Sequence, residues 1–498
     1  MTLVEDGRRP APVRLSRPAP GRRLLVLPSW LCWALPGLLT LAACLVEIGS
    51  RPVWRDEEAS WAAARLPLPE LWRLVQHVDF VLAPYYLLLH GWIAVFGDGP
   101  TALRLPSALA MAGAGALLGA LGRRLLGSPG AGLRAGLLFA VTPTVARYGQ
   151  EARPYAFAML FALLATLLLT RRQWLGYSAA LVCCGGAHAV TLTILAAHAA
   201  YVWQSGRGER RRWAAAVAAA VALLSPLLWY GHRQGGQIAW NHTTWPDAAA
   251  MPYMLFRSPA VCAAVLAGVV ALLRSALRRA VPADRRPSRP ETALLALWAL
   301  LPPAVTLLTT DALHLFLPRY LLFTVPAWAL AAAYGWGGWG GWPGGRLCGR
   351  LRGRALLGAG LVLLGLALLS RPGVVLRNDP SEPAYRPVAR AVLAGYRPGD
   401  GVAYAGHRQE RRAMAYWWRN TPPKARPAEL PAGAGCAAQP TGPPRVWLVS
   451  TAAGGGPYRA MPACEARALR SRYRVERIER FPNVRLLLLV ARGESGQP

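Results

Sequence analysis

The stretch PYYLLLHGWIAVFG, residues 84–97, decides how this chain is threaded through a membrane. As an α-helix it would be about 21 Å long, at about 1.5 Å per residue, whereas the hydrocarbon core of a bilayer is about 30 Å thick. We therefore predict that residues 85–96 form an interfacial or re-entrant helix that does not cross the membrane.

The arginines between the apolar segments support this threading. With the N-terminus inside, the inner segments hold 24 arginines and the outer loops before residue 371 hold ten. This bias follows the positive-inside rule, whereas a crossing at 84–97 would place most of the arginines outside. We predict about 11 transmembrane helices, at 24–47, 101–121, 132–148, 154–170, 173–187, 189–204, 213–230, 258–274, 291–309, 319–335 and 354–370.

Composition indicates the same class of protein. Of the 498 residues, 54% are hydrophobic, and the mean hydropathy is +0.26, which is unusual for a soluble chain. The formal net charge of +32 could suggest nucleic acid binding. However, the arginines lie in short blocks between apolar runs, which is the pattern of topology signals. We therefore expect membrane lipids as partners and no nucleic acid.

Three regions follow from this threading. Residues 1–23, rich in proline and arginine, are expected to be a disordered cytoplasmic tail. Residues 24–370 are expected to form the transmembrane domain, with residues 48–100 as its first outer loop, called here the 48–100 segment. Residues 375–498 have a soluble pattern and are expected to form a small α/β domain outside the cytoplasm.

The C-terminal domain alternates between strand and helix patterns. Strands are predicted at 402–404, 446–449 and 486–490, and helices at 386–393, 410–418 and 464–472. Cys436 and Cys464 could form a disulfide if this domain is exported. It carries no recognisable catalytic group, which leaves docking, acceptor selection and stabilisation open as its role.

Three consecutive carboxylates lie near the start of the 48–100 segment, in WRDEEASW, residues 54–61. Because carboxylates at a membrane surface are costly to dehydrate, a cluster there calls for a functional explanation. The alternative is a solvated loop or a helix N-terminus, where acidic groups interact favourably with the helix dipole. Function is favoured because Asp79, the stretch QEARPY at 150–155 and Arg319 fall on the same predicted side.

Four motifs occur together and in order. They are Trp-x-Asp-Glu at 54–57, Asp79 followed by PYYLLLH at 84–90, LRLPS at 103–107, and QEARPY at 150–155. In these motifs the chain resembles the bacterial family 39-type glycosyltransferases, relatives of protein O-mannosyltransferases and of the lipid A aminoarabinose transferase. The resemblance covers about residues 24–330. It implies a GT-C fold, an all-α polytopic membrane protein whose first outer loop carries the catalytic acid.

The resemblance also implies roles for individual residues. Asp56 would be the catalytic base, supported by Glu57, and Asp56 with Glu151 could bind a divalent cation such as Mg²⁺ or Mn²⁺. Arg319 and Arg153 would bind the donor phosphate. Asp79, Tyr85 and Tyr86 would bind the acceptor or support the site.

The expected activity is transfer of a hexose, with mannose as the leading candidate, from a polyprenyl-phosphate donor. The acceptor would be a hydroxyl group on a protein, lipid or glycan, and inversion at the anomeric carbon follows if Asp56 acts as a base. The protein would be multi-pass in the cell membrane, with its N-terminus cytoplasmic and its C-terminal domain outside.

Two other classes of function stay open. One is a polytopic transporter or flippase of a lipid-linked sugar. Transport predicts ionisable residues facing each other at mid-membrane depth, and the predicted spans are nearly free of them. The other is a non-enzymatic membrane scaffold for the exported domain.

Overall fold

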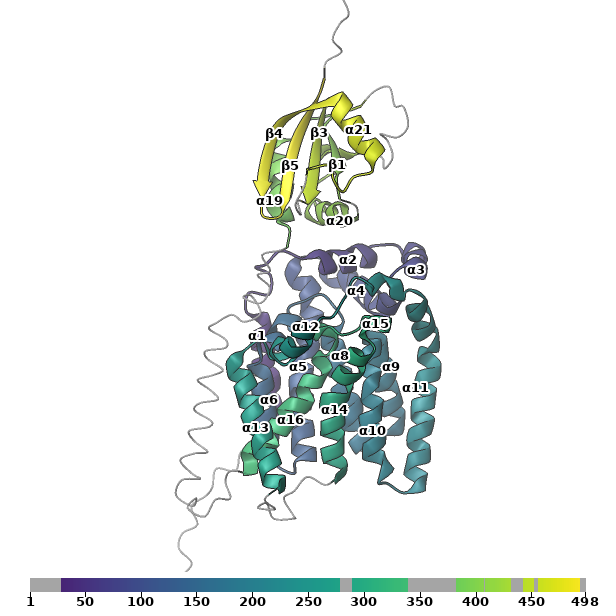
Figure 1. Cartoon of the computed structure of the whole chain (residues 1–498), viewed down its shortest axis with the longest axis vertical. Helices are drawn as coiled ribbons and strands as arrows, with labels where there is room; N and C mark the ends of the chain where they lie inside the picture. The colour runs from purple at the N-terminus through teal and green to yellow at the C-terminus, as the bar shows by residue number, and fades with distance from the viewer. Residues whose placement is uncertain are drawn as a thin grey trace, which may run out of the picture.

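The computed structural model describes residues 28–277, 289–338, 382–406, 408–430, 442–451 and 456–492. The predicted tail at 1–23, the predicted span at 354–370 and Cys436 lie outside these residues. The described chain forms a helical body, a layer of short helices over one end of it, and a C-terminal α/β unit beyond that layer (Figure 1).

The helical body contains the following helices in chain order: α1 (Leu31–Leu45), α5 (Pro100–Leu125), α6 (Pro129–Ala140), α7 (Pro143–Gly149), α8 (Tyr155–Thr170), α9 (Trp174–Ala187), α10 (Ile194–Trp203), α11 (Arg207–Arg233), α12 (Trp245–Phe256), α13 (Pro259–Leu277), α14 (Arg289–Leu308), α15 (Thr310–Leu313) and α16 (Val325–Gly338). Short 3-10 turns join some of them: η2 (Ala189–Thr193), η3 (Gly235–Ile238), η5 (Pro318–Tyr320) and η6 (Leu322–Thr324).

The number of spans is not confirmed. Among the described residues, three helices are long and apolar enough to cross a bilayer, namely Pro100–Leu125, Arg207–Arg233 and Pro290–Leu308. The pair α12 and α13, bent by 94°, is a fourth candidate. Helices occupy every predicted span that falls within the described residues, but most are shorter than the roughly 20 residues that a crossing needs.

Interruptions of the helical structure explain why these helices are shorter than the predicted spans. The predicted span 132–148 is divided into α6 and α7 just before Pro143, because proline cannot donate a backbone hydrogen bond inside a helix. The predicted span 319–335 starts with the turns η5 and η6, and its regular helix begins only at Val325.

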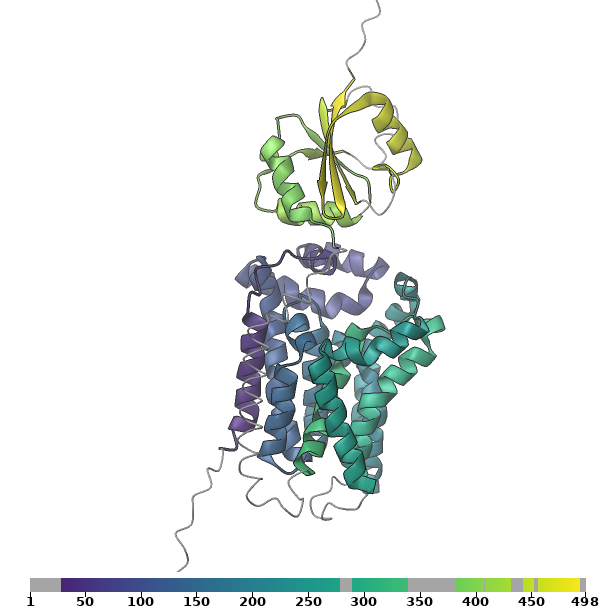
Figure 2. The same ribbon diagram turned by 60° about the vertical axis from the view of Figure 1, so that its left-hand side comes forward.

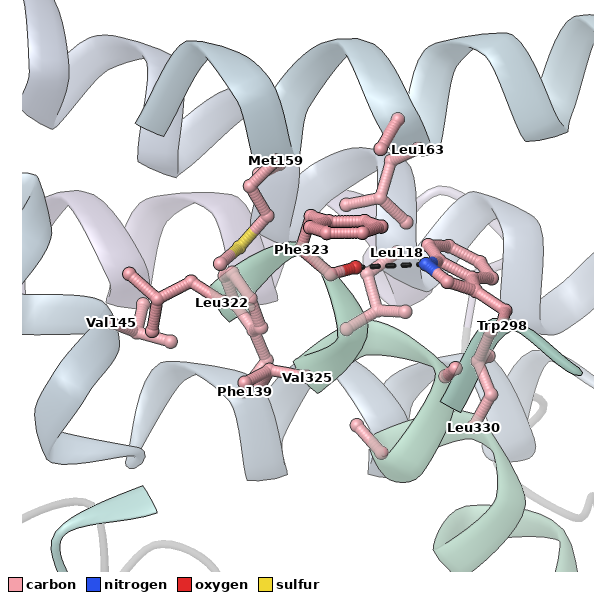
Figure 3. Close-up of a cluster of buried hydrophobic side chains, with 14 of the residues drawn as sticks. Leu118, Phe139, Val145, Met159, Leu163, Trp298, Leu322, Phe323, Val325 and Leu330 are labelled. Carbon is pink, nitrogen blue, oxygen red and sulfur yellow. Dashed lines mark hydrogen bonds between the residues drawn. The ribbon is translucent and has the colours of Figure 1, made fainter. Parts of the chain in front are cut away.

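The core of the helical body lies where α5, α6, α8, α14 and α16 meet (Figure 3). Trp298 of α14 is buried there, and its indole Nε1 donates a 2.9 Å hydrogen bond to the carbonyl oxygen of Phe323. Helices α13 and α16 approach closely at Gly268 and Gly335, since a Cβ on Gly335 would overlap the Gly268 carbonyl group. Contacts through small residues of this kind are typical of helix pairs in membranes.

The layer of short helices is built by the 48–100 segment. It contains α2 (Arg55–Ala64), α3 (Leu68–His77), η1 (Phe80–Leu82) and α4 (Ala83–Phe96). Leu71 and Val75 of α3, four residues apart, are buried, while Leu68 and Trp72 on the same helix are exposed. Helix α4 has 14 residues, as the short apolar stretch predicts, and lies in this layer rather than along the body (Figure 1).

In its described residues, the C-terminal unit between positions 382 and 492 is a five-stranded sheet with three α-helices and the 3-10 turn η8 (Pro423–Ala425). Its elements are α19 (Tyr385–Gly395), β1 (Gly401–Tyr404), α20 (Arg408–Trp417), β2 (Ala428–Glu429), β3 (Arg445–Thr451), α21 (Ala463–Arg472), β4 (Tyr473–Phe481) and β5 (Val484–Ala491). The strand order is β2-β1-β3-β5-β4, parallel across the first three strands and antiparallel across the last three. Helices α19 and α20 lie on the side of this unit that faces the layer (Figures 1 and 2).

All three predicted strands and all three predicted helices of this unit are present. The sequence analysis missed β2 and β4. β2 has only two residues, and β4 is an edge strand whose exposed Arg474, Glu476 and Arg477 break the apolar alternation. Charged side chains on an edge strand hinder pairing with another chain.

Candidate active site

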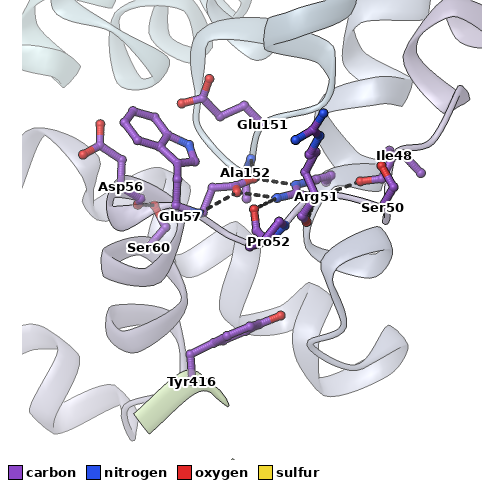
Figure 4. A network of polar contacts seen from close by, with 12 residues as sticks. Ile48, Ser50, Arg51, Pro52, Asp56, Glu57, Ser60, Glu151, Ala152 and Tyr416 are labelled. Atoms are coloured by element: carbon purple, nitrogen blue, oxygen red, sulfur yellow. Dashed lines mark hydrogen bonds and ion pairs between the residues drawn. The ribbon is translucent and has the colours of Figure 1, made fainter. Parts of the chain in front are cut away.

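Three of the four sequence motifs, those at 54–57, 103–107 and 150–155, meet at the buried carboxylate of Glu57. Arg104 of α5 donates to it through two nitrogens, with distances of 2.7 Å from Nε to Oε1 and 2.6 Å from Nη2 to Oε2 (Figure 4). Both side chains are fully buried. The same guanidinium group donates to the carbonyl oxygens of Ile48, Arg51 and Pro52. This pair therefore attaches α2 and the chain that leads into it to the helical body.

The motif at 150–155 adds further bonds at the same place. The backbone N–H of Ala152 donates to Glu57 Oε1 at 3.0 Å. Arg153 donates to the Ser60 hydroxyl at 3.3 Å, and the Ser107 hydroxyl donates to the Arg153 carbonyl at 3.2 Å. Motifs that are far apart in the sequence are thus parts of one hydrogen-bonded corner.

Asp56 and Glu57 are neighbours in different environments. Asp56 lies in the first turn of α2, and its side chain is 24% exposed, whereas that of Glu57 is completely buried. Figure 4 shows the Asp56 carboxylate on the same side of the network as Glu151, while the Glu57 carboxylate points into the network. Of these two carboxylates, only Asp56 has an exposed side-chain surface that a ligand could reach.

Glu151 is buried and only half paired. Its Oε2 accepts a 2.6 Å bond from Arg147, whereas its Oε1 is buried without a hydrogen-bond partner. Burial raises the pKa of Glu151, and Arg147 opposes this rise. Arg147 also lies over the rings of Trp54 and Tyr148, at 5.6 Å and 5.3 Å from their centroids.

Two arginines lie near Asp56, and neither is paired with a carboxylate in the part of the chain that the structure describes. Asp56 interacts electrostatically with both Arg153 and Arg319. In the described part of the chain neither guanidinium group forms an ion pair, and the Nε atom of each is buried without a hydrogen-bond partner. Arg319 lies over the rings of Trp240 and Tyr320, at 5.9 Å and 5.5 Å. The site therefore has positive charge available for an anion.

Asp79, Tyr85 and Tyr86 lie beside this arrangement. The Tyr86 hydroxyl donates to Asp79 Oδ2 at 3.0 Å, and both tyrosines interact electrostatically with Arg153. Asp79 has a left-handed backbone, with φ of 60°. The turn at Asp79 is held by Gln234, which follows the C-terminal end of α11. The side-chain oxygen of Gln234 accepts a 2.8 Å hydrogen bond from the Phe80 N–H.

Sequence reasoning missed two members of the site. Arg147 stands four residues before Glu151, a spacing that could have indicated an ion pair. His188 follows α9, and its ring lies 4.4 Å from that of Tyr320 and 6.0 Å from that of Tyr155. Nothing near His188 in the sequence signals this position.

The side chains that could bind a cation at this site, those of Asp56 and Glu151, offer oxygen atoms as ligands. Among the described residues, no group of three or more His, Cys, Asp or Glu side chains could hold a metal ion. Asp56 and Glu151 offer two carboxylates on one side of the network, one with an unpartnered buried oxygen. Mg²⁺ binds through one or two carboxylates together with water and substrate phosphate, so this pair fits such an ion.

Comparisons with known proteins agree with the motifs. Residues 83–230 match a family model described as dolichyl-phosphate-mannose-protein mannosyltransferase. No curated protein matches the chain. The crystal structure of ArnT from Cupriavidus metallidurans bound to undecaprenyl phosphate has a TM-score of 0.55 at 12% identity, over 91% of this chain and 97% of that chain. The apo structure of the same protein gives a TM-score of 0.55 at 13% identity over the same shares.

These matches confirm the resemblance that the motifs carry. The structural likeness establishes a mostly helical GT-C fold with a small C-terminal sheet. The matched family segment contains Tyr85, Tyr86, Glu151 and Arg153, and it leaves out Asp56. A membrane location agrees with the three described helices that are long and apolar enough to cross a bilayer.

Proposed function

We propose that this chain, a membrane glycosyltransferase of the GT-C type, transfers a hexose from a polyprenyl-phosphate donor to a hydroxyl acceptor. The observation that supports this most is the partly exposed Asp56 carboxylate beside Arg153 and Arg319, which form no ion pairs among the described residues. A base and available cations at one place suit a hydroxyl nucleophile and a phosphate leaving group.

Asp56 acts as the general base in this proposal. A hydroxyl group is a weak nucleophile at neutral pH, and a nearby carboxylate that accepts its proton accelerates attack. The acceptor oxygen forms a bond to the anomeric carbon, the hydroxyl proton passes to Asp56, and the bond from that carbon to the phosphate oxygen breaks. The phosphate leaves with the bonding electrons, and the configuration at the anomeric carbon inverts.

Arg153 and Arg319 receive the departing phosphate. A guanidinium group can give two parallel hydrogen bonds to phosphate, and it keeps its charge at any physiological pH. The Nε atoms without partners are donors that such a ligand would use. Stabilising the negative charge that develops on the leaving group lowers the barrier to transfer.

Glu57, Asp79, Tyr85 and Tyr86 have supporting roles. Glu57 fixes α2 through Arg104, which holds the neighbouring Asp56 in place. Asp79 and Tyr86, joined by a hydrogen bond, are assigned with Tyr85 to the acceptor side or to support of the site.

Asp56 and Glu151 are the residues proposed to hold a divalent cation. These residues would hold Mg²⁺ or Mn²⁺, and the ion would supply positive charge near the phosphate.

Several finer assignments belong to the same proposal. Mannose is the leading sugar because the family model that matches residues 83–230 is named for mannosyl transfer. A polyprenyl-phosphate donor is supported by the crystal structure of ArnT with undecaprenyl phosphate. The arginine distribution supports a cytoplasmic N-terminus and a reaction on the outer face, with a protein, lipid or glycan as acceptor.

The proposal is tested by transfer in proteoliposomes from a panel of synthetic polyprenyl-phosphate hexoses. We expect Asp56→Asn to lower kcat by about 10²- to 10⁴-fold, the usual contribution of a positioned base. Glu70→Gln is the matched control, because Glu70 is an exposed carboxylate in the first turn of α3, in the same layer.

Equal turnover by Asp56→Asn and the wild type would refute Asp56 as the base. Movement of a labelled lipid-linked sugar across the bilayer, without transfer to any hydroxyl, would favour the transporter or flippase alternative.

A further inference from the structure

Helix α20 of the C-terminal unit docks on α2, the helix that carries Asp56. Tyr416 of α20 and Trp61 of α2 pack edge to face, with ring centroids 5.1 Å apart at 90°. Tyr416 is fully buried, and its apolar neighbours are those of the 48–100 segment, such as Val53, Trp61 and Leu103. Figure 4 shows Tyr416 approaching α2 from the side away from Glu151.

Asp98 joins the two parts beside this ring contact. Its Oδ2 accepts from the Trp61 indole Nε1 and from Arg65, both at 2.9 Å, and both donors belong to the 48–100 segment. Its Oδ1 accepts from Arg419 of the C-terminal unit at 2.9 Å. The Tyr416 hydroxyl donates to the Asp98 backbone carbonyl at 3.2 Å.

Helix α20 has two faces with separate partners. Ala413, Met414 and Trp418 pack into the core of the C-terminal unit with strand residues such as Trp447. Tyr416 is absent from that core and belongs to the apolar cluster of the layer. A substitution at Tyr416 therefore alters the docking surface and leaves the core of the C-terminal unit intact.

Helix α2 needs such contacts because it is short. A helix of 10 residues is marginal in water, and its stability comes from tertiary packing. The Glu57–Arg104 pair holds its N-terminal turn to the helical body, and Tyr416 holds Trp61 from the other side. Asp56 directly precedes Glu57 in the first turn of this helix, so its position depends on how the helix is held.

We propose that the C-terminal unit is a positioning element of the active site, and that Tyr416 and Arg419 are its positioning residues. They hold Trp61 and Asp98, and so fix α2 in the orientation in which Asp56 meets the acceptor hydroxyl. Neither residue touches substrate. This inference rests on the proposed role of Asp56.

The test uses the full-length protein in proteoliposomes with a polyprenyl-phosphate hexose that the wild type accepts. We expect Tyr416→Ala to lower kcat at least tenfold and to leave the donor KM within about twofold, because the arginines assigned to the phosphate lie outside this interface. Tyr416→Phe keeps the ring contact with Trp61 and is expected to retain at least half of kcat. Arg411→Ala is the control on the same helix, since Arg411 pairs with Glu429 inside the C-terminal unit.

Hydrogen exchange provides a readout that does not depend on turnover. In Tyr416→Ala we expect faster amide exchange across residues 55–64, with unchanged protection in β3 and β5. If Tyr416→Ala does not accumulate, Arg419→Gln replaces it and is expected to shift both readouts in the same direction.

Unchanged kcat in Tyr416→Ala would overturn the inference, whatever the exchange result. A fall in kcat without faster exchange at 55–64 would also overturn it, since α2 would then be held by other contacts. A wild type that transfers no sugar would refute the proposed function, while the exchange at 55–64 would still decide whether the C-terminal unit holds α2.

Discussion

Asp56 and Glu57 are adjacent carboxylates in one helical turn, yet their side chains lie in different environments. The Glu57 carboxylate accepts from two nitrogens of Arg104 and from the backbone N–H of Ala152, inside the protein. Asp56 is partly exposed and faces arginines that have no ion-pair partner in the described chain. The sequence predicted the location of this acidic cluster, but Arg104 lies 47 residues beyond Glu57, and sequence spacing alone could not identify it as the partner.

The Glu57–Arg104 pair predicts a large loss of stability when one partner is removed. Breaking a fully buried ion pair costs roughly 3–5 kcal/mol, because the remaining charge is left without compensation. We therefore expect Glu57→Gln and Arg104→Met each to lower the unfolding temperature in detergent strongly. The double variant should cost less than the sum of the two single variants, since neither charge is then left alone.

Thermal unfolding of the two single variants and the double variant measures this coupling. Arg73→Met is a suitable control, because Arg73 is an exposed arginine of α3 in the same segment. Additive losses in the double variant would show that the two side chains do not act as a pair.

At the scale of elements, the length and apolar pattern of the sequence predicted individual helices and strands better than they predicted the continuity of the spans. The 14 residues of α4 and most elements of the C-terminal unit were predicted from the sequence. The continuity of the spans was not, because proline breaks and short 3-10 turns divide apolar runs that look continuous. The docking of α20 on α2 could not be predicted either, since Tyr416 resembles any core aromatic residue of a helix.

Helix α2 carries a second buried carboxylate, Glu58, which interacts electrostatically with charged residues of the C-terminal unit. Glu58 is almost completely buried, and its Oε2 has no hydrogen-bond partner. Burial raises the pKa of Glu58 well above its usual range, Glu382 and Glu57 add to the rise, and Arg412 opposes it. The folded protein thus holds this proton more tightly than the unfolded chain does. Stability is therefore lost as the pH rises from the unfolded pKa through the folded one.

We expect Glu58→Gln to remove this pH dependence. Its unfolding temperature should exceed that of the wild type at pH 8 and approach it at pH 5, where Glu58 is more often protonated. Calorimetry across this range measures the difference, with Glu70→Gln as the exposed control. A constant difference between variant and wild type at every pH would contradict the titration of Glu58.

At the scale of the whole molecule, Asp98 connects the layer to the C-terminal unit. Burial alone would raise the pKa of Asp98, but hydrogen bonds from Trp61 and Arg419 and the charges of Arg419 and Arg65 outweigh it and lower the pKa. A carboxylate with a depressed folded pKa stabilises the folded state above its unfolded pKa. That contribution is lost as the pH falls through the folded pKa, so acid weakens this contact.

We therefore expect the C-terminal unit of the wild type to undock in acid before its own sheet unfolds. Hydrogen exchange should show faster exchange in α20, relative to the intrinsic rate at each pH, as the pH falls below about 4, close to the ordinary pKa of an aspartate, with β3 and β5 still protected. Asp98→Asn should show this faster exchange already at neutral pH. Asp247→Asn is the control, because Asp247 is an exposed carboxylate that accepts hydrogen bonds from Thr244 and lies in α12 of the helical body. Simultaneous loss of protection in α20 and the sheet would contradict separate undocking.

The contact between Asp98 and Arg419 joins residues that are 321 positions apart. During synthesis, α2 leaves the ribosome long before α20 exists. The Glu57–Arg104 attachment can form early, but the attachment through Tyr416 and Arg419 has to wait until residue 419 has been made. A chain that terminates before α20 therefore lacks one of the two attachments of the helix that bears Asp56.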